Sequence, residues 1–164
     1  MELGVLGADE WQILRDVRLR ALKDSPGAYF SDYEVEASWT EASWRSSFGQ
    51  SQWIVARDRE QVIGVARSVR VDGRPADERH VESVWVDPNA RRTGVLRAIL
   101  RHATEVEPEV TDWLVWVVDD NVQALSVYDH LGFRLTGERQ PLVDGSGRTE
   151  IRLRFRNRHG VRTE

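Results

Sequence analysis

The fold is decided by the segment Val84-Trp85-Val86-Asp87-Pro88-Asn89-Ala90-Arg91-Arg92-Thr93-Gly94-Val95-Leu96. Val84 and Val86 alternate along a predicted β-strand, and Pro88 ends it because proline cannot donate a ladder hydrogen bond. After Gly94, apolar residues recur at helical spacing: Val95, Leu96, Ile99, Leu100, Ala103 and Val106. The segment therefore predicts a strand, a short basic loop and an amphipathic helix in direct succession.

The start of this predicted helix has the features of an anion-binding site. Its first N–H groups lack intrahelical partners and lie at the positive end of the helix macrodipole. Arg91 and Arg92 add positive charge, and Gly94 lets the backbone approach a ligand closely. The arrangement suits a phosphate or a diphosphate. Taken alone, it is equally compatible with a solvated basic helix start.

Length and composition indicate one globular domain and exclude several kinds of chemistry. The 164 residues are 40% hydrophobic and 30% charged, with a net charge of −4 that argues against a protein built around nucleic-acid phosphates. The absence of cysteine excludes disulfides and thiolate catalysis, and Lys23 is the only lysine. No apolar run reaches the roughly 20 residues of a membrane span. We expect a cytoplasmic protein that holds no metal and binds neither membranes nor nucleic acid.

The rest of the chain predicts helices and strands around this segment. A helix is expected over residues 9–23 and a shorter one after Ser38, whose spacing to Glu41 matches a capping box. In the last predicted strand, residues 149–156, apolar side chains alternate with a charged face that we expect to meet solvent. The other predicted strands cover residues 53–56, 62–71, 80–86, 113–118 and 133–135. This order predicts a mixed α/β sheet.

A second informative pattern lies downstream, Asn-x-x-Ala-x-x-x-Tyr-x-x-x-Gly-Phe, with Asn121 at its start and Tyr128 in the middle. These two residues are seven apart and project from one side of a helix, which Asn121 can cap and Gly132 can end. Together with residues 84–96, the pattern resembles the GNAT superfamily of N-acetyltransferases, over about residues 9–156. One position departs from the family: Leu96 stands where a second Gly or Ala is usual, and we expect its side chain to pack in the core.

The resemblance implies an α/β fold in which helices flank a mixed, mostly antiparallel sheet with splayed central parallel strands. It implies one domain over residues 1–164, with a core of about 9–156 and a short basic tail at 157–164. Family members pair through sheet edges or terminal strands, so a homodimer is compatible with the resemblance.

The resemblance also implies acetyl-CoA as the acetyl donor, bound as a cosubstrate and without a metal. Its diphosphate would be held by the loop and helix start, and its pantetheine arm would lie beside the main chain of the central strand. Asn121 and Ser126 are further expected contacts, although helix capping alone explains Asn121 and a surface position alone explains Ser126. The implied cofactor residues are Val84, Trp85, Val86, Arg91, Arg92, Thr93, Gly94, Val95, Leu96, Asn121 and Ser126.

Acetyl transfer to an amine requires a group that removes a proton and a group that supplies one. An alkyl ammonium has a pKa of about 10.4 in water and must lose a proton before it attacks. Tyr128 is predicted to be the general acid, because a phenol stays protonated at neutral pH and can donate to the departing thiolate. Glu82 is our first choice for the base and His80 the second, since they share one face of the strand. The alternatives are that Tyr128 is an ordinary core residue and that Glu82 and His80 are ordinary residues near a strand end. A chain of water molecules would then act as the base.

The acceptor is expected to be a small-molecule or peptide amine held by residues 24–48 and 141–148. Carboxylates beside aromatic rings in the first region suit a cationic amine. The carboxylates and aromatic residues of this region are Tyr29, Phe30, Asp32, Tyr33, Glu34, Glu36, Trp39 and Trp44. Two other functions stay open. One is an acyl-CoA sensor or regulatory domain without turnover, and the other is a nucleic-acid surface made of Arg148, Arg152, Arg154, Arg156, Arg158 and Arg162.

Overall fold

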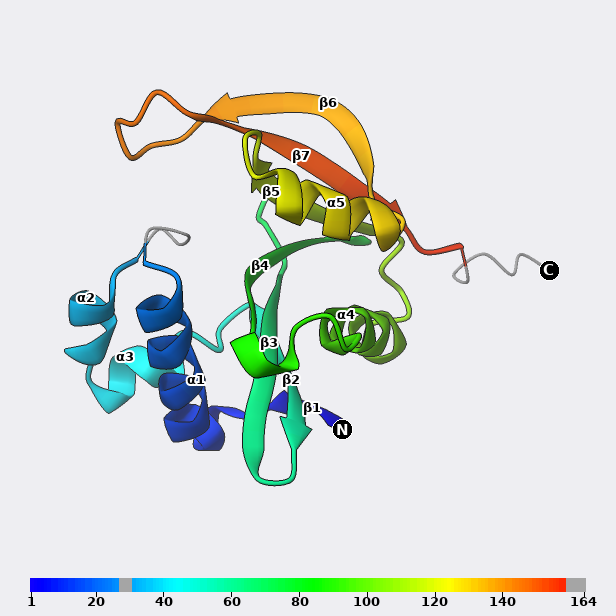
Figure 1. Cartoon of the computed structure of the whole chain (residues 1–164). Helices are drawn as coiled ribbons and strands as arrows, with labels where there is room; N and C mark the ends of the chain where they lie inside the picture. Colours follow the sequence, from blue (N-terminus) through cyan, green and yellow to red (C-terminus); the bar gives the residue numbers. More distant parts are fainter. Residues whose placement is uncertain (27–30, 159–164) are drawn as a thin grey trace.

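A seven-stranded sheet with helices on both faces forms the centre of the molecule (Figure 1). The computed structural model describes residues 1–26 and 31–158. The strand order is β1-β2-β3-β4-β5-β7-β6, and only β4 and β5 run parallel among the neighbouring pairs described. The strands are β1 (Glu2–Leu6), β2 (Ser51–Asp58), β3 (Gln61–Val69), β4 (Glu78–Val86), β5 (Asp112–Val118), β6 (Arg134–Pro141) and β7 (Thr149–Arg156). The predicted mixed, mostly antiparallel α/β sheet is confirmed.

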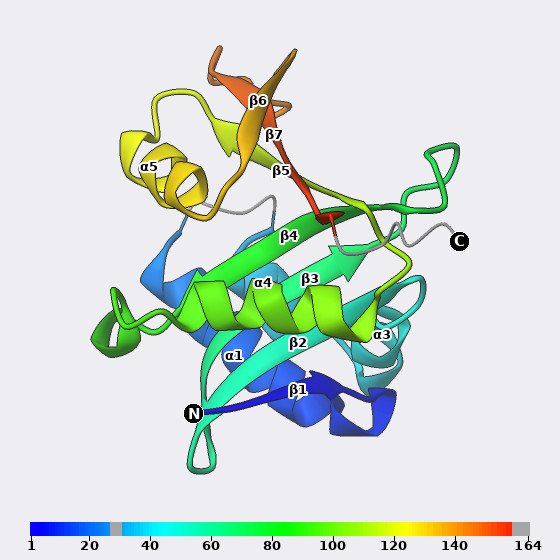
Figure 2. The ribbon, with the colours of Figure 1, turned by 90° about the vertical axis from the view of Figure 1, so that its right-hand side faces the viewer.

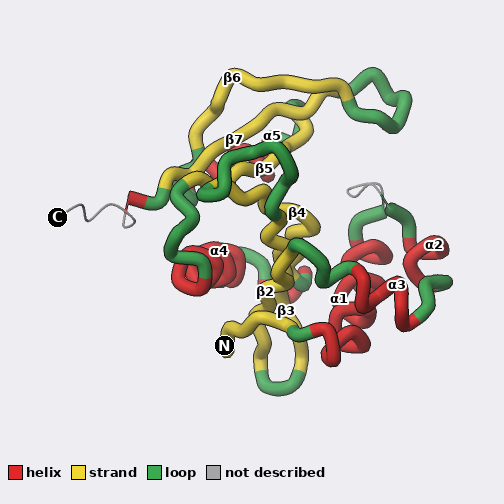
Figure 3. Tube along the Cα trace, turned by 180° about the vertical axis from the view of Figure 1, so that it is seen from behind, coloured by secondary structure: helices red, strands yellow, loops and turns green. Residues whose placement is uncertain are grey.

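The helices divide between the two faces of the sheet (Figure 3). The α1 face carries α1 (Trp11–Asp24), α2 (Tyr33–Ala37) and α3 (Glu41–Ser46), and the α4 face carries α4 (Val95–Val106) and α5 (Val122–His130). Two short 3-10 helices, η1 (Ala8–Glu10) and η2 (Pro88–Ala90), precede α1 and α4. In the part of the chain that the structure describes, no helix combines the length and the apolar character needed to cross a membrane.

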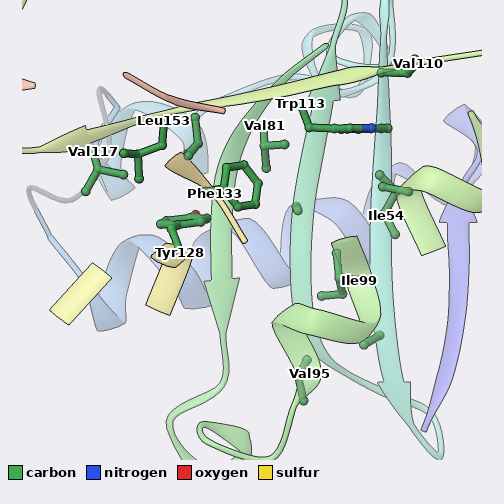
Figure 4. Packing of buried hydrophobic residues seen from close by; sticks show 14 residues of the cluster. Ile54, Val81, Val95, Ile99, Val110, Trp113, Val117, Tyr128, Phe133 and Leu153 are labelled. Carbon is green, nitrogen blue, oxygen red and sulfur yellow. The ribbon is translucent and has the colours of Figure 1, made fainter. Parts of the chain in front are cut away.

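Each face of the sheet has its own hydrophobic core. Large aromatic residues dominate the core of the α1 face, where Trp44, Trp53 and Trp85 are buried among aliphatic side chains. On the α4 face, Ile99 and Tyr128 pack with residues of the strands, as Figure 4 shows. The sheet therefore separates two packed layers, and neighbouring residues at the end of β4 belong to different layers: Val84 and Val86 to the α4 face and Trp85 to the α1 face.

The two parallel strands at the centre pair over a short length only. Their register joins Glu78 with Asp112, Arg79 with Trp113 and His80 with Leu114, and the pairing stops there. Beyond this point β4 and β5 diverge, which Figure 2 shows clearly. The expected splay of the central strands is thus confirmed, and His80 lies where it begins.

A close approach of helix to sheet fixes where α4 starts. A Cβ atom added to Gly64 of β3 would lie 2.6 Å from Cγ1 of Val95 and 2.9 Å from Cδ1 of Ile99. Only glycine permits this approach. Since Val95 is the first residue of α4, the contact holds the N-terminus of the helix against the middle of the sheet.

Several predicted boundaries were wrong. No strand was predicted before residue 53, whereas the sheet also contains β1 at Glu2–Leu6, which pairs with the edge of β2. An additional helix, α2, begins after Asp32, whose carboxylate accepts a hydrogen bond from the Val35 amide at 2.9 Å. Ser38 ends that helix, and Thr40 rather than Ser38 caps α3 by accepting a hydrogen bond from the Ser43 amide at 3.2 Å.

Candidate functional site

The N-terminus of α4 lacks a side-chain cap. Gly94 occupies the cap position with a left-handed φ of +87°, and the first helical hydrogen bond runs from the Ala98 amide to the Gly94 carbonyl at 3.0 Å. Helix geometry leaves the amides of Val95, Leu96 and Arg97 without acceptors inside the helix. A Cβ atom at Gly94 would meet nothing within 4 Å, so the space in front of the helix start is open. This end of α4 can receive an anion.

The loop before α4 is exposed and carries fixed positive charge. Thr93 donates its hydroxyl hydrogen to the Ala90 carbonyl at 2.6 Å, and Arg92 adopts a left-handed φ of +63°. The Arg91 guanidinium donates from Nε to the Val86 carbonyl at 3.0 Å and from Nη2 to Oδ2 of Asp24 at 2.5 Å. The predicted loop residues are therefore gathered at the helix start, with Arg91 held by the end of β4 and the end of α1.

The end of β4 runs into this loop from the point where the strand leaves β5. Val84 and Val86 are partly buried against the core of the α4 face. Trp85 points to the other face, is 4% exposed, and donates its indole hydrogen to Asp24 at 3.0 Å. Main chain of the predicted pantetheine segment thus borders the region where the central strands separate.

Leu96 packs against the core of the α4 face. The expectation that its side chain packs in the core is confirmed. The side chain therefore does not need to obstruct a ligand at the helix start, because there the backbone N–H of Leu96 is the group that can bind an anion.

Tyr128 lies on the α4 face, near the end of α5. Its ring is buried and packs edge-to-face on Phe133, with the ring centroids 5.2 Å apart (Figure 4). Asn121 caps α5 by accepting a hydrogen bond from the Ala124 amide at 3.1 Å, and Gly132 follows the helix with a φ of +94°, so both predicted helix ends are confirmed. Ser126 is exposed on the same helix. The helix therefore presents a buried phenol beside the diverging strands.

Glu82 and His80 lie on the opposite face of β4 from Tyr128. The Glu82 side chain is half-exposed, and its Oε2 lies 3.9 Å from Nη1 of Arg67. His80 is buried, and within residues 1–26 and 31–158 neither ring nitrogen has a hydrogen-bond partner. Burial lowers the pKa of His80 below its usual value, and the positive charge of Arg152 lowers it further. At neutral pH His80 is thus an uncharged imidazole at the point of strand divergence.

The charged face of the last strand is partly buried, contrary to the expectation from its alternation. Arg152 lies with its guanidinium 4.4 Å from the ring centre of Trp116 and donates to Glu138 at 2.5 Å. Oε1 of Glu150 accepts a hydrogen bond from the side-chain Nε2 of Gln140 at 2.5 Å. These three contacts come from β5 and β6, the two strands that flank β7 in the sheet.

The arginines proposed as a nucleic-acid surface mostly have acidic partners. Arg152 pairs with Glu138, and Arg148 pairs with Asp144 at 3.4 Å. Arg154 and Arg156 both lie within 4.0 Å of Asp112. Arg158 is exposed, and Arg162 lies outside the described residues. Paired guanidinium groups are poorly suited to phosphate binding, so this surface does not support the nucleic-acid hypothesis.

Part of the expected acceptor region is used for structure. Glu36 is 1% exposed and forms a two-point ion pair with Arg18, at 3.1 and 2.7 Å. Trp44 is buried in the core, with its ring centre 4.9 Å from that of Trp39. Asp32 caps α2, and the predicted residues Tyr29 and Phe30 lie outside the described residues. Tyr33 and Glu34 remain exposed.

No cluster of three or more His, Asp or Glu side chains with metal-binding geometry occurs in the described part of the chain. The candidate site residues offer backbone amides, arginines, a phenol, an imidazole and a carboxylate. These groups bind anions and move protons.

Comparison with known sequences assigns residues 18–133 to the acetyltransferase (GNAT) family. Among curated proteins, the chain is similar to the peptidyl-lysine N-acetyltransferase YjaB of Escherichia coli, with 30% identity over 96 residues. That match covers 58% of this chain and 56% of the relative, so the chain spans little more than half the length of this relative.

Solved structures share the fold across nearly the whole chain. The ribosomal-protein-S18-alanine N-acetyltransferase of Escherichia coli matches with a TM-score of 0.70 and 19% identity, covering 99% of this chain and 96% of that one. The PaiA N-acetyltransferase of Thermoplasma acidophilum, solved in complex with coenzyme A, matches with a TM-score of 0.64 and 15% identity, covering 94% and 100%. The family match extends over most of the sheet, the basic loop and the Tyr128 helix, and the chain belongs to the GNAT family of acetyltransferases.

Proposed function

We propose that the protein moves the acetyl group of acetyl-CoA to an amine, by direct attack while both substrates are bound. The observation that carries this proposal is the uncapped start of α4 beside two arginines, at the place where β4 leaves β5. Family membership supports acetyl transfer, and the coenzyme A complex of the PaiA enzyme supports the identity of the donor.

The residues present fit the donor. The amides of Val95 and Leu96 and the side chains of Arg91 and Arg92 would hold the diphosphate, and the open space at Gly94 admits it. Thr93 shapes the loop through its bond to Ala90. When bound, acetyl-CoA supplies the thioester carbonyl that the amine attacks.

The main chain of Val84, Trp85 and Val86 would line the pantetheine arm, because β4 has left its neighbour there. Asn121 and Ser126 would border the donor from α5. Since the carboxamide oxygen of Asn121 already caps the helix, its contribution to binding would come from its remaining NH2 group.

Tyr128 is the proposed general acid. Its phenol would give a proton to the thiolate of coenzyme A as the thioester bond breaks. The hydroxyl belongs to a ring that is held in place by packing on Phe133, which orients the donor before reaction. A buried, oriented phenol at this end of α5 suits that role better than an exposed one.

Glu82 is the proposed base, with His80 as the second choice and a water chain as the alternative. Glu82 is solvent-accessible on the α1 face, so it can receive a proton from an incoming ammonium directly or through water. His80 has an uncharged ring two residues away on the same face. Glu82→Gln should lower kcat/KM and change its pH profile, whereas a wild-type profile would assign the proton to His80 or to water.

The acceptor class is an amine, and peptides with lysine are the first members to test because YjaB is a peptidyl-lysine N-acetyltransferase. Exposed Glu34 and Tyr33 near the start of α2 suit a cation. The test is release of free thiol from acetyl-CoA in the presence of lysine peptides, peptides with a free N-terminus, polyamines, amino acids and aminoglycosides. Thiol release that depends on one amine class supports the proposal and names the acceptor.

The second function is an acyl-CoA-binding sensor or regulatory domain. It is favoured by the half-exposed and loosely paired state of Glu82, which leaves the site without a strongly held base. This function predicts tight binding of acetyl-CoA with no thiol release for any amine in the panel.

A further inference from the structure

We propose that Asp24 is a positioning residue of the donor site, whose carboxylate holds the Arg91 guanidinium where it meets the diphosphate of acetyl-CoA. The inference rests on the proposed function, because it concerns how the same loop binds the donor. It adds a residue of α1, far from the loop in sequence, to the determinants of donor affinity.

Asp24 is held in place by a buried tryptophan. Its Oδ2 accepts hydrogen bonds from Nε1 of Trp85 at 3.0 Å, from the Ser25 hydroxyl at 3.0 Å and from Nη2 of Arg91 at 2.5 Å. Because Trp85 is 4% exposed in the core of the α1 face, its indole fixes the carboxylate relative to β4. These three hydrogen bonds lower the pKa of Asp24, with the bond from Trp85 as the first cause, and so keep it ionised.

The position of Asp24 in its own helix does not explain the residue. It is the last residue of α1, where a negative charge meets the negative end of the helix macrodipole. Local helix stability therefore disfavours a carboxylate here. The compensating interactions are the tertiary contacts to Trp85 and Arg91, residues 61 and 67 positions further along the chain.

Arg91 keeps donors for a ligand while it is held. A guanidinium has about five N–H groups, and two of those in Arg91 are used by Val86 and Asp24. The remaining N–H groups belong to a side chain that is 47% exposed at the start of α4. Two fixed points orient the plane of the guanidinium, and the rest of its donors stay available to phosphate oxygens.

A second contact from α1 supports the same junction. Arg20 lies with its guanidinium 5.3 Å from the ring centre of Trp85, and its Nη1 is 3.6 Å from Oδ2 of Asp87. Trp85 is thus held between Arg20 and Asp24 of one helix. The end of α1 therefore braces the strand, the loop and Arg91 before any ligand arrives, which reduces the ordering that binding requires.

The test is a double-mutant cycle in the full-length protein, read out by calorimetric binding of coenzyme A. Asp24→Asn keeps an acceptor for the Trp85 indole and removes the charge that holds Arg91. We expect Asp24→Asn to weaken coenzyme A binding about tenfold, within the usual range of coupled pairs. In an Arg91→Gln background the same change should have less than a twofold effect. Glu105→Gln is the matched control, because Glu105 is an exposed carboxylate near a helix C-terminus that pairs with Arg101 at 2.9 Å.

Separate outcomes overturn the inference and the proposed function. An equal effect of Asp24→Asn with and without Arg91, or tighter binding in the single variant, would overturn the positioning role. A similar loss of affinity for S-acetylpantetheine, which lacks the diphosphate, would also overturn the positioning role. The effect of Asp24 would then not depend on the diphosphate. If Asp24→Asn fails to fold, Asp24→Gln, which also removes the charge and keeps a carboxamide acceptor for the Trp85 indole, replaces it in the cycle. Failure of the wild-type protein to bind coenzyme A would instead contradict the proposed function and the inference with it.

Discussion

Tyr128 is the residue whose proposed role is most open to a direct kinetic test. Tyr128→Phe should lower kcat at saturating acetyl-CoA by about 10²-fold, because it removes a general acid while the ring remains. The affinity for coenzyme A should change little. Steady-state kinetics and calorimetric binding measure the two effects separately.

Stability provides the control for this substitution. Phenylalanine can keep the edge-to-face contact with Phe133, so the loss of stability should not exceed that of one hydrogen bond, about 1 kcal/mol. Wild-type kcat in Tyr128→Phe would show that Tyr128 is a core residue without a catalytic role.

His80 should make the folded state sensitive to pH. Its folded-state pKa is lowered by burial and by Arg152, in surroundings that also contain Glu78, Arg74 and Glu138. As pH falls below about 6.5, the unfolded chain takes up the His80 proton first, so stability is lost until the folded-state pKa is passed.

The measurement is the free energy of unfolding in denaturant between pH 5 and pH 7. His80→Gln removes the group that titrates, so its free energy should fall less steeply toward low pH than that of the wild type. Parallel curves for the two proteins would contradict a lowered pKa at His80.

Single residues show why only part of the site could be predicted. Gly94 and Asn121 act through local backbone geometry: the predicted cap at Asn121 is confirmed, and Gly94 occupies the N-cap position of α4. Asp24 acts through Trp85 and Arg91, which are distant in sequence, and no local pattern indicates that contact. The role of Glu36 could not be predicted for the same reason, because its ion-pair partner Arg18 lies on another helix.

At the scale of elements, the position of α4 depends on its contact with β3. Gly64→Ala should destabilise the fold by about 1–3 kcal/mol, because the new methyl group would overlap Val95 and Ile99. Since Val95 begins the helix, the same change should also weaken coenzyme A binding. Denaturant unfolding and calorimetry measure the two effects, and an unchanged affinity in a destabilised variant would separate the helix position from donor binding.

Leu96 offers the opposite case at the same helix start. Leu96→Ala should lower the free energy of unfolding by at most about 2 kcal/mol, the lower end for a leucine in a core, because the side chain is only partly buried. The affinity for coenzyme A should stay within about twofold, because the amide of residue 96 is retained. A large gain in affinity would show that the leucine side chain restricts the donor site.

The predicted elements were correct where hydrophobic periodicity is strong and wrong where it is weak. β4, α4 and β5 follow from long apolar patterns and short turns, and each was placed to within about two residues at its ends. β1 and α2 have five residues each, which is too short for a periodic signal. They are stabilised by tertiary pairing, β1 on β2 and α2 through Glu36 and Arg18.

At the scale of the whole molecule, the sheet places the proposed acid and base on opposite sides of the diverging strands. Tyr128 belongs to the α4 face, and Glu82 and His80 belong to the α1 face. The opening between β4 and β5 begins at His80 and Leu114. A thioester held there would meet its proton donor from one face and its amine from the other.

The overall architecture could be predicted because the strand, loop and helix of residues 84–96 and the Tyr128 helix form a specific pair of motifs. The acceptor side could not, because its residues are shared with structural tasks that spacing does not reveal. Trp44 is a core residue, Glu36 is the ion-pair partner of Arg18, and Asp32 caps α2.

The central claim, acetyl transfer from acetyl-CoA to an amine, is tested most directly by following a labelled acetyl group. The wild-type protein is incubated with acetyl-labelled acetyl-CoA and each amine class, and the products are identified by mass spectrometry while free thiol is measured. We predict a labelled amide on one amine class, formed in equal amount to the released thiol and strongly reduced in Tyr128→Phe. Binding of coenzyme A without labelled amide or thiol release for any amine would contradict the account.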